Sequence, residues 1–128
     1  MDDELYKANI LDHYHHPHRK GALPLYDVKR SGDNPSCGDD LTLYLKWGSN
    51  GSVQQIGWEG SGCAISQATA SMLADQVVGK DKIGIMNIRI TDIYELLGIP
   101  IGESREKCAK LALCTLHDAV EKGNVDRL

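Results

Sequence analysis

Phenylalanine is absent from this chain, and aromatic residues make up only 5% of it. Hydrophobic residues nevertheless fill 41% of the 128 positions, so the core must be built mainly from aliphatic side chains. A chain of this length and apolar content can bury a core without disulfide or metal staples. We therefore expect a single domain spanning residues 1–128.

Long apolar runs are missing too. No stretch of the sequence approaches the roughly 18 apolar residues of a membrane-spanning helix. The acidic opening Met1-Asp2-Asp3-Glu4 is unlike a signal peptide, which begins with positive charge. The sequence therefore predicts a cytoplasmic protein with no membrane partner, in which the four cysteines are thiols and not disulfides.

Clustered positive charge and nucleotide-binding motifs are also missing. The formal net charge is −4, and the basic run His18-Arg19-Lys20 is too short for a phosphate-binding face. Gly60-Ser61-Gly62 begins like a dinucleotide fingerprint, but Ile65 occupies the third glycine position. No Gly-Lys-Ser or Gly-Lys-Thr follows either. These absences argue against nucleic acid and nucleotides as partners.

No two cysteines form a local Cys-x-x-Cys pair. Cys63 follows Cys37 by 26 residues, and Cys108 follows Cys63 by 45, which excludes a zinc ribbon. Cys37 lies with Asp39 in a turn that Asn34-Pro35 and Gly38 favour. Cys63 begins a helical pattern and Cys108 lies in the first turns of another, where helix-start amides favour the thiolate that binds metal.

A predicted hairpin explains how distant cysteines could meet. Alternating apolar residues predict a strand at 41–47, with Thr42, Tyr44 and Lys46 pointing outward, and a second strand at 53–59. Cys37 comes just before the first strand and Cys63 just after the second, so antiparallel pairing brings them together.

The remaining pattern is mostly helical. Apolar spacing predicts helices at 2–16, with Leu5, Ile10 and Leu11 among its apolar residues, at 63–78 and at about 104–122. A short strand at 28–31 and a helix at 93–97, capped by Thr91-Asp92, complete the expected elements.

Three segments carry a family resemblance. Residues 34–39 (NPSCGD), 60–66 (GSGCAIS) and 105–109 (REKCA) resemble the three cysteine motifs of the IscU/SufU/NifU-N family of iron–sulfur cluster scaffold proteins. The similarity covers nearly the whole chain, including the opening Ile10-Leu11-Asp12-His13-Tyr14. It implies a NifU-N/IscU-like α+β fold, with a small antiparallel sheet of about three strands and helices packed on one face.

Two positions depart from the IscU pattern. Lys107 stands where IscU proteins have histidine, and residues 97–101 lack the Leu-Pro-Pro-Val-Lys motif, which argues against an Hsp70-type chaperone partner. The Arg-x-Lys-Cys pattern resembles SufU, yet the interval between Cys63 and Cys108 is too short for the SufU insert. The sequence therefore leaves open whether the chain belongs to the IscU or the SufU branch of the family.

The resemblance implies a scaffold that accepts sulfur from a cysteine desulfurase, binds iron and assembles a transient two-iron two-sulfur cluster. The cluster then passes to apo iron–sulfur proteins. Cys37, Asp39, Cys63 and Cys108 are the implied ligands, and the three cysteines are candidate persulfide acceptors. The alternative is a zinc-bound sulfurtransferase of SufU type, and zinc is expected in the purified protein. In either function, we expect the protein to be a scaffold or a sulfur acceptor and not an enzyme with catalytic turnover.

A hydrolytic function and further metal ligands are disfavoured by the chemistry and position of the residues. A hydrolytic zinc site is disfavoured because three thiolates neutralise the Lewis acidity of the metal. Lys107 cannot ligate metal as an ammonium, so we expect it to act through charge. Cys114 falls on the opposite side of its helix from Cys108, with His117 on that solvated side. The histidines at positions 13–18 are interpreted as a helix end and not as a metal site.

Overall fold

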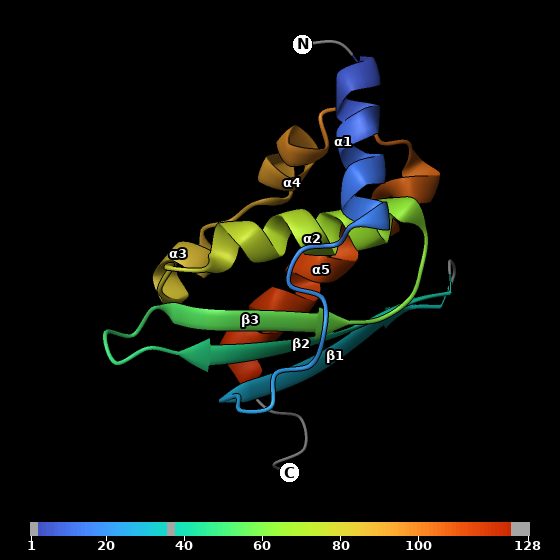
Figure 1. Ribbon diagram of the computed structural model, residues 1–128. Helices are drawn as coiled ribbons and strands as arrows, with labels where there is room; N and C mark the ends of the chain where they lie inside the picture. Colours follow the sequence, from blue (N-terminus) through green and yellow to red (C-terminus); the bar gives the residue numbers. More distant parts are fainter. Residues whose placement is uncertain (1–2, 36–37, 124–128) are drawn as a thin grey trace.

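The structure, a computed structural model, describes residues 3–35 and 38–123 (Figure 1). Its elements in chain order are α1 (Asp3–His15), β1 (Val28–Asn34), β2 (Asp39–Trp47), β3 (Val53–Glu59), α2 (Ala64–Val77), α3 (Lys82–Met86), α4 (Ile90–Leu97) and α5 (Glu103–Lys122). No helix in these ranges is long and apolar enough to cross a membrane. That the chain is one domain stays a prediction.

The three strands form an antiparallel sheet in the order β1-β2-β3. Leu45 at the centre of β2 pairs with Val28 of β1 and Ile56 of β3, and all three are buried. The helices lie on one face of this sheet, where α2 and α5 pack between it and α1 (Figure 1). The predicted α+β architecture is confirmed.

The other face of the sheet is less exposed than the alternation of β2 predicts. Tyr44 was expected to point to solvent but is buried, because the chain between α1 and β1 crosses this face and places Tyr26 edge-on, 5.3 Å from its ring. The Tyr44 hydroxyl donates a 2.5 Å hydrogen bond to Glu59. This bond, with burial, raises the pKa of Tyr44 to about 12.

Two element boundaries differ from the sequence prediction. β1 continues to Asn34 instead of ending at Ser31, which brings its last residue opposite Asp39. α4 begins at Ile90 and not at Ile93, because Asp92 caps the helix from within its first turn, accepting a hydrogen bond from the Arg89 N–H at 2.8 Å.

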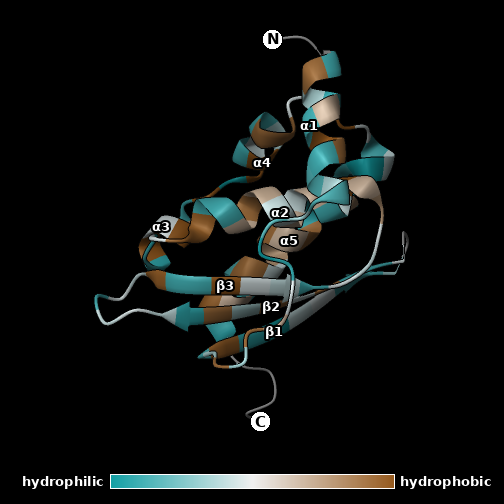
Figure 2. Ribbon diagram, in the orientation of Figure 1, coloured by the Kyte–Doolittle hydropathy of each residue, from teal (hydrophilic) through white to brown (hydrophobic). Residues whose placement is uncertain are grey.

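The predicted apolar face of α1 is wrong in part. Ile10 is buried as expected, but Leu5 and Leu11 are 55% and 50% exposed, and apolar and polar residues alternate around this helix (Figure 2). Polar contacts help to hold α1 on α2: His13 Nδ1 lies 2.7 Å from Ser71 Oγ, which also accepts a 2.7 Å hydrogen bond from the His18 N–H. The interpretation of these histidines as a plain helix end missed this contact.

The α1–α2 contact should make stability depend on pH. Burial, and next the neighbouring His18, lower the pKa of His13 below its usual 6.5, against the opposing effect of Asp75 and Asp12. The unfolded chain then binds the proton more readily, so this contribution to stability is present above about pH 6.5 and is lost as the pH falls below it. His13→Gln should show less loss of stability than the wild type between pH 7.5 and 5.5 in urea unfolding. An equal loss in both proteins would contradict this assignment.

Candidate metal centre

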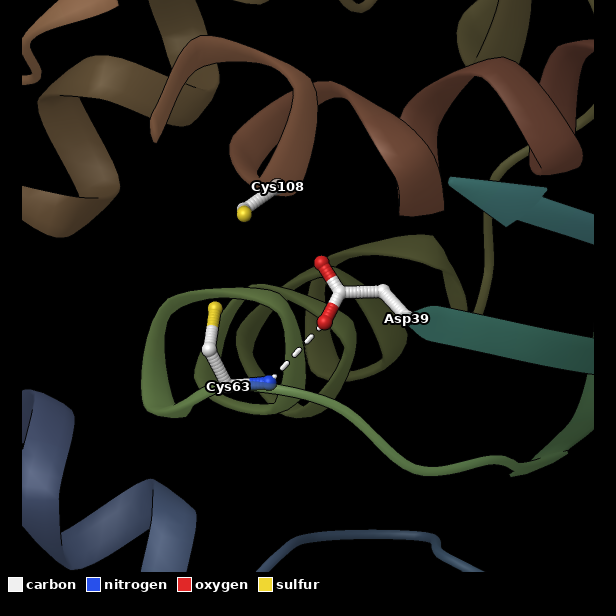
Figure 3. Close-up of side chains that lie close together, drawn as sticks. All are labelled: Asp39, Cys63 and Cys108. Carbon is white, nitrogen blue, oxygen red and sulfur yellow. Dashed lines mark hydrogen bonds between the residues drawn. The ribbon is translucent and has the colours of Figure 1, made fainter. Parts of the chain in front are cut away.

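Three elements bring a carboxylate and two thiols together at one end of the sheet. Asp39 is the first residue of β2, Cys63 is the N-cap residue of α2, and Cys108 lies in α5. Their side chains point toward one shared space (Figure 3), and one ligand atom from each lies within 4.8 Å of the others. Two ligands of a tetrahedral zinc ion with bonds of about 2.3 Å lie about 3.8 Å apart, so a small contraction would bring these three atoms to the distances of zinc ligands.

Strand periodicity aims Asp39 inward. It has the same parity in β2 as Leu41 and Leu43, so it projects toward the helices and is only 2% exposed. A carboxylate in that position is costly to bury unless it is paired or bound to metal. The hydrophobic pattern of the strand thus forces the carboxylate into the site.

A close turn after β3 places Cys63 beside Asp39. Gly60 has φ of 149°, and a Cβ on it would lie 2.2 Å from the Asp40 carbonyl oxygen, so this turn needs glycine. The Asp40 N–H donates to the Ser61 carbonyl at 2.9 Å, which ties the turn to the start of β2. The predicted hairpin is confirmed, and it brings Asp39 beside Cys63; that it also brings Cys37 there stays a prediction, because Cys37 lies outside the described residues.

The two oxygens of the Asp39 carboxylate have different surroundings. Oδ1 accepts a 3.0 Å hydrogen bond from the Cys63 N–H, the dashed line in Figure 3. Oδ2 is buried and has no hydrogen-bond partner in the described part of the chain. An unmet buried acceptor costs about 1–3 kcal/mol, and a bound cation would remove that cost. The carboxylate and thiol donors therefore fit a metal ion.

Cys63 lies at a helix start as expected, but Cys108 does not. Cys63 has extended φ and ψ immediately before α2. Cys108 is the sixth residue of α5, beyond the first turn to which the effect of a helix terminus is confined. It is buried against the core, as its place at the edge of the apolar arc predicted.

The other predicted site residues lie in different surroundings. Cys37 lies outside the described residues. Lys107 is exposed and, with Lys110 and Cys114, lines a hollow of about 260 Å³ beside Asn34. Cys114 is exposed and outside the group formed by Asp39, Cys63 and Cys108, which agrees with its predicted position.

The prediction of a solvated His117 is wrong. This residue is half-buried, and its Nε2 lies 3.0 Å from the carbonyl oxygen of Ile85 in α3. The helical phase places His117 outside the apolar arc, and no pattern in the sequence indicates that α3 lies against that side of α5.

Comparison with known proteins places this geometry in a family. Residues 5–125 match the model of the NifU-like N-terminal domain, which is nearly all of the chain. The chain belongs to that family. The resemblance seen in the three cysteine motifs is thereby confirmed.

Relatives of this NifU-like domain carry two different names. The zinc-dependent sulfurtransferase SufU of Bacillus subtilis is 33% identical over 94% of this chain and 92% of its own length. The iron–sulfur cluster assembly scaffold protein IscU of Streptococcus pyogenes is 30% identical over 94% of this chain and 85% of its own length. The crystal structure of a NifU-like N-terminal protein from Brucella abortus, 24% identical, matches the fold with a TM-score of 0.75 over 92% of this chain and 93% of that one.

Sequence reasoning missed Gly62 as a supporting residue of the NifU-like site. A Cβ at this position would lie 2.3 Å from Asp39 Oδ1 and 2.5 Å from Ser66 Oγ. The Gly-x-Gly pattern before Cys63 was the available signal, and it counted as part of the second cysteine motif and as an incomplete nucleotide motif, but not as room for a carboxylate. Gly62 is small because the carboxylate occupies the space that a side chain would fill.

Gly62→Ala should therefore displace the Asp39 carboxylate. We expect zinc affinity to fall by roughly 10- to 100-fold, as it does when outer-shell support of a ligand is lost. The measurement is zinc affinity by competition with a chromophoric chelator. Gly102→Ala is the matched control, because a Cβ there meets nothing within 4 Å. Equal affinities for the two variants would show that Asp39 is not a ligand.

Proposed function

We propose that this NifU-like domain is an iron–sulfur cluster assembly scaffold, which accepts sulfur from a cysteine desulfurase and carries a two-iron two-sulfur cluster as transient cargo. The observation that carries the proposal is the buried, unpartnered Asp39 Oδ2 beside the thiols of Cys63 and Cys108. The ligand set is completed by Cys37, which the family motif supplies. Similarity to a protein named as an IscU scaffold supports the assignment.

The combination of cysteine and aspartate ligands suits a metal ion or cluster that must later be released. Cysteine thiolates are soft ligands that select iron or zinc, whereas a carboxylate is a harder and more exchangeable ligand for these metals. The Cys63 N–H orients Asp39 toward the thiols, while the carboxylate remains the weakest member of the set. A site with one weak ligand holds its metal and can still release it.

A zinc-bound sulfurtransferase is the second candidate. It is favoured by the similarity to a protein named as zinc-dependent SufU, and by Lys107 in place of the histidine of IscU proteins. In this function the same residues would hold zinc, and a cysteine would take sulfur from the desulfurase as a persulfide. Zinc would hold the thiolates in place until one of them leaves it by ligand exchange; that thiolate would attack the outer sulfur of the desulfurase persulfide, and the S–S bond there would break to release the desulfurase thiolate.

The partners follow from either function. A cysteine desulfurase supplies the sulfur, and apo iron–sulfur proteins receive the cluster if the domain is a scaffold. A cytoplasmic location, where thiols stay reduced, is part of the proposal.

Anaerobic reconstitution tests the scaffold proposal. After addition of a cysteine desulfurase, cysteine and ferrous iron, the wild type and Cys114→Ser should develop the visible absorption of a two-iron two-sulfur cluster. Cys37→Ser, Cys63→Ser and Cys108→Ser should not, because each lacks one thiol ligand. Zinc binding and persulfide formation without any visible band in the wild type would favour the sulfurtransferase instead.

Lys107 should act on sulfur transfer and not on metal binding. Its side chain is exposed and lines the hollow beside Asn34, one residue before Cys108, where an ammonium can favour a thiolate or meet an acidic partner surface. Lys107→Ala should therefore retain zinc but accept sulfur more slowly, and Lys107→His should also retain zinc. Lys110→Ala, one turn along α5, controls for loss of a nearby charge. Loss of zinc from Lys107→Ala would show a metal-binding role, and an unchanged transfer rate would leave Lys107 an ordinary surface residue.

A further inference from the structure

Asn34 and Asp39 face each other at the end of the sheet. They are paired residues in the β1–β2 ladder, and both project toward the helices. Asn34 is 6% exposed and Asp39 is 2% exposed. Asn34 belongs to the turn and to the first cysteine motif in the sequence, but neither explains its burial opposite a proposed metal ligand.

Each of these residues has one buried polar atom without a partner among the described residues, and the two atoms are complementary. Asn34 Nδ2 is a hydrogen-bond donor, and Asp39 Oδ2 is an acceptor. Directly opposed residues of an antiparallel pair have Cβ atoms about 4.5–5.5 Å apart, so a change of side-chain torsion can bring two such short side chains into contact. A buried donor left open beside a buried acceptor is costly, and pairing them removes both costs.

The observed position of Asp39 excludes that pairing. Its Oδ1 is held by the Cys63 N–H, and its carboxylate points toward Cys63 and Cys108 (Figure 3). Neither Asn34 Nδ2 nor Asp39 Oδ2 has a hydrogen-bond partner among the described residues, so the two are not bonded to each other. The carboxylate therefore has two alternatives, to face the thiols or to accept a hydrogen bond from Asn34. A metal ion at the thiols stabilises the first, and Asn34 stabilises the second.

We propose that Asn34 is a positioning residue that receives the Asp39 carboxylate when it withdraws from the metal centre. This inference rests on the proposed function. Because the Asn34–Asp39 hydrogen bond forms only after the metal–carboxylate bond breaks, it stabilises the departing state and speeds release of the metal or cluster. The ease with which cargo leaves is thus set partly by a residue that never touches the metal.

Zinc release to an excess of chelator tests the proposal. Asn34→Leu removes the amide at similar size, and Asn34→Ala removes it altogether. Both should release zinc about ten-fold more slowly than the wild type, the effect expected for losing one hydrogen bond to a charged acceptor.

In an Asp39→Ala background, neither change at Asn34 should alter the release rate. Val28→Ala, at a buried position of the same strand opposite Leu45, controls for lost packing and should release zinc at the wild-type rate.

Faster or unchanged release from both Asn34 variants would overturn the proposal. So would a slowing that persists in the Asp39→Ala background, because the Asn34 amide would then act on something else, such as a ligand in the neighbouring hollow lined by Lys107 and Lys110.

A measurement on the metal-free protein separates this inference from the proposed function. The side-chain amide resonances of Asn34, followed by NMR, should shift on Asp39→Ala even without metal, and should shift again when zinc is added to the wild type. If the wild type binds no zinc, the proposed function fails, while the first shift still tests the Asn34–Asp39 contact. Absence of the first shift would refute the contact itself.

Discussion

The hydrogen bond from the Cys63 N–H to the Asp39 carboxylate is the contact on which the proposed site depends. It joins the first residue of β2 to the residue that begins α2, two positions 24 residues apart in the chain. It also fixes the direction of the second carboxylate oxygen, which faces the thiols of Cys63 and Cys108 without a partner in the described structure. Without this bond, the parity of β2 would still direct Asp39 toward the helices, but no described hydrogen bond would hold its carboxylate beside Cys63.

The surrounding fold can be understood as the support for that contact. The hairpin of β2 and β3 returns the chain to the start of β2, and Gly60 and Gly62 keep the connecting turn close enough for the bond to form. α5 closes the site with Cys108 from the buried side. In the proposed release step, Asn34, opposite Asp39, donates a hydrogen bond to the carboxylate after it leaves the metal. The contacts that would hold the Asp39 carboxylate and the one that would receive it therefore lie on either side of it, at the start of α2 and at the end of β1.

Much of this arrangement was predictable because it follows from periodicity and from motifs. The alternation of residues 41–47 located β2, and the three cysteine motifs identified the family. What periodicity cannot encode is which surfaces later elements cover. Tyr44 was misplaced because the chain before β1 folds over the outer face of the sheet, and His117 because α3 lies against α5. Gly62 and Asn34 were overlooked because their roles depend on contacts with a carboxylate distant in sequence or across a strand pair.

X-ray absorption at the zinc edge of the zinc-loaded protein tests the central claim most directly. We expect three sulfur ligands at about 2.3 Å and one oxygen ligand at about 2.0–2.2 Å. In Asp39→Ala the three sulfur ligands should remain, while the oxygen contribution weakens or becomes that of a bound water. A spectrum with four sulfur ligands, or one dominated by oxygen and nitrogen, would contradict a metal centre built from Asp39 and three cysteines.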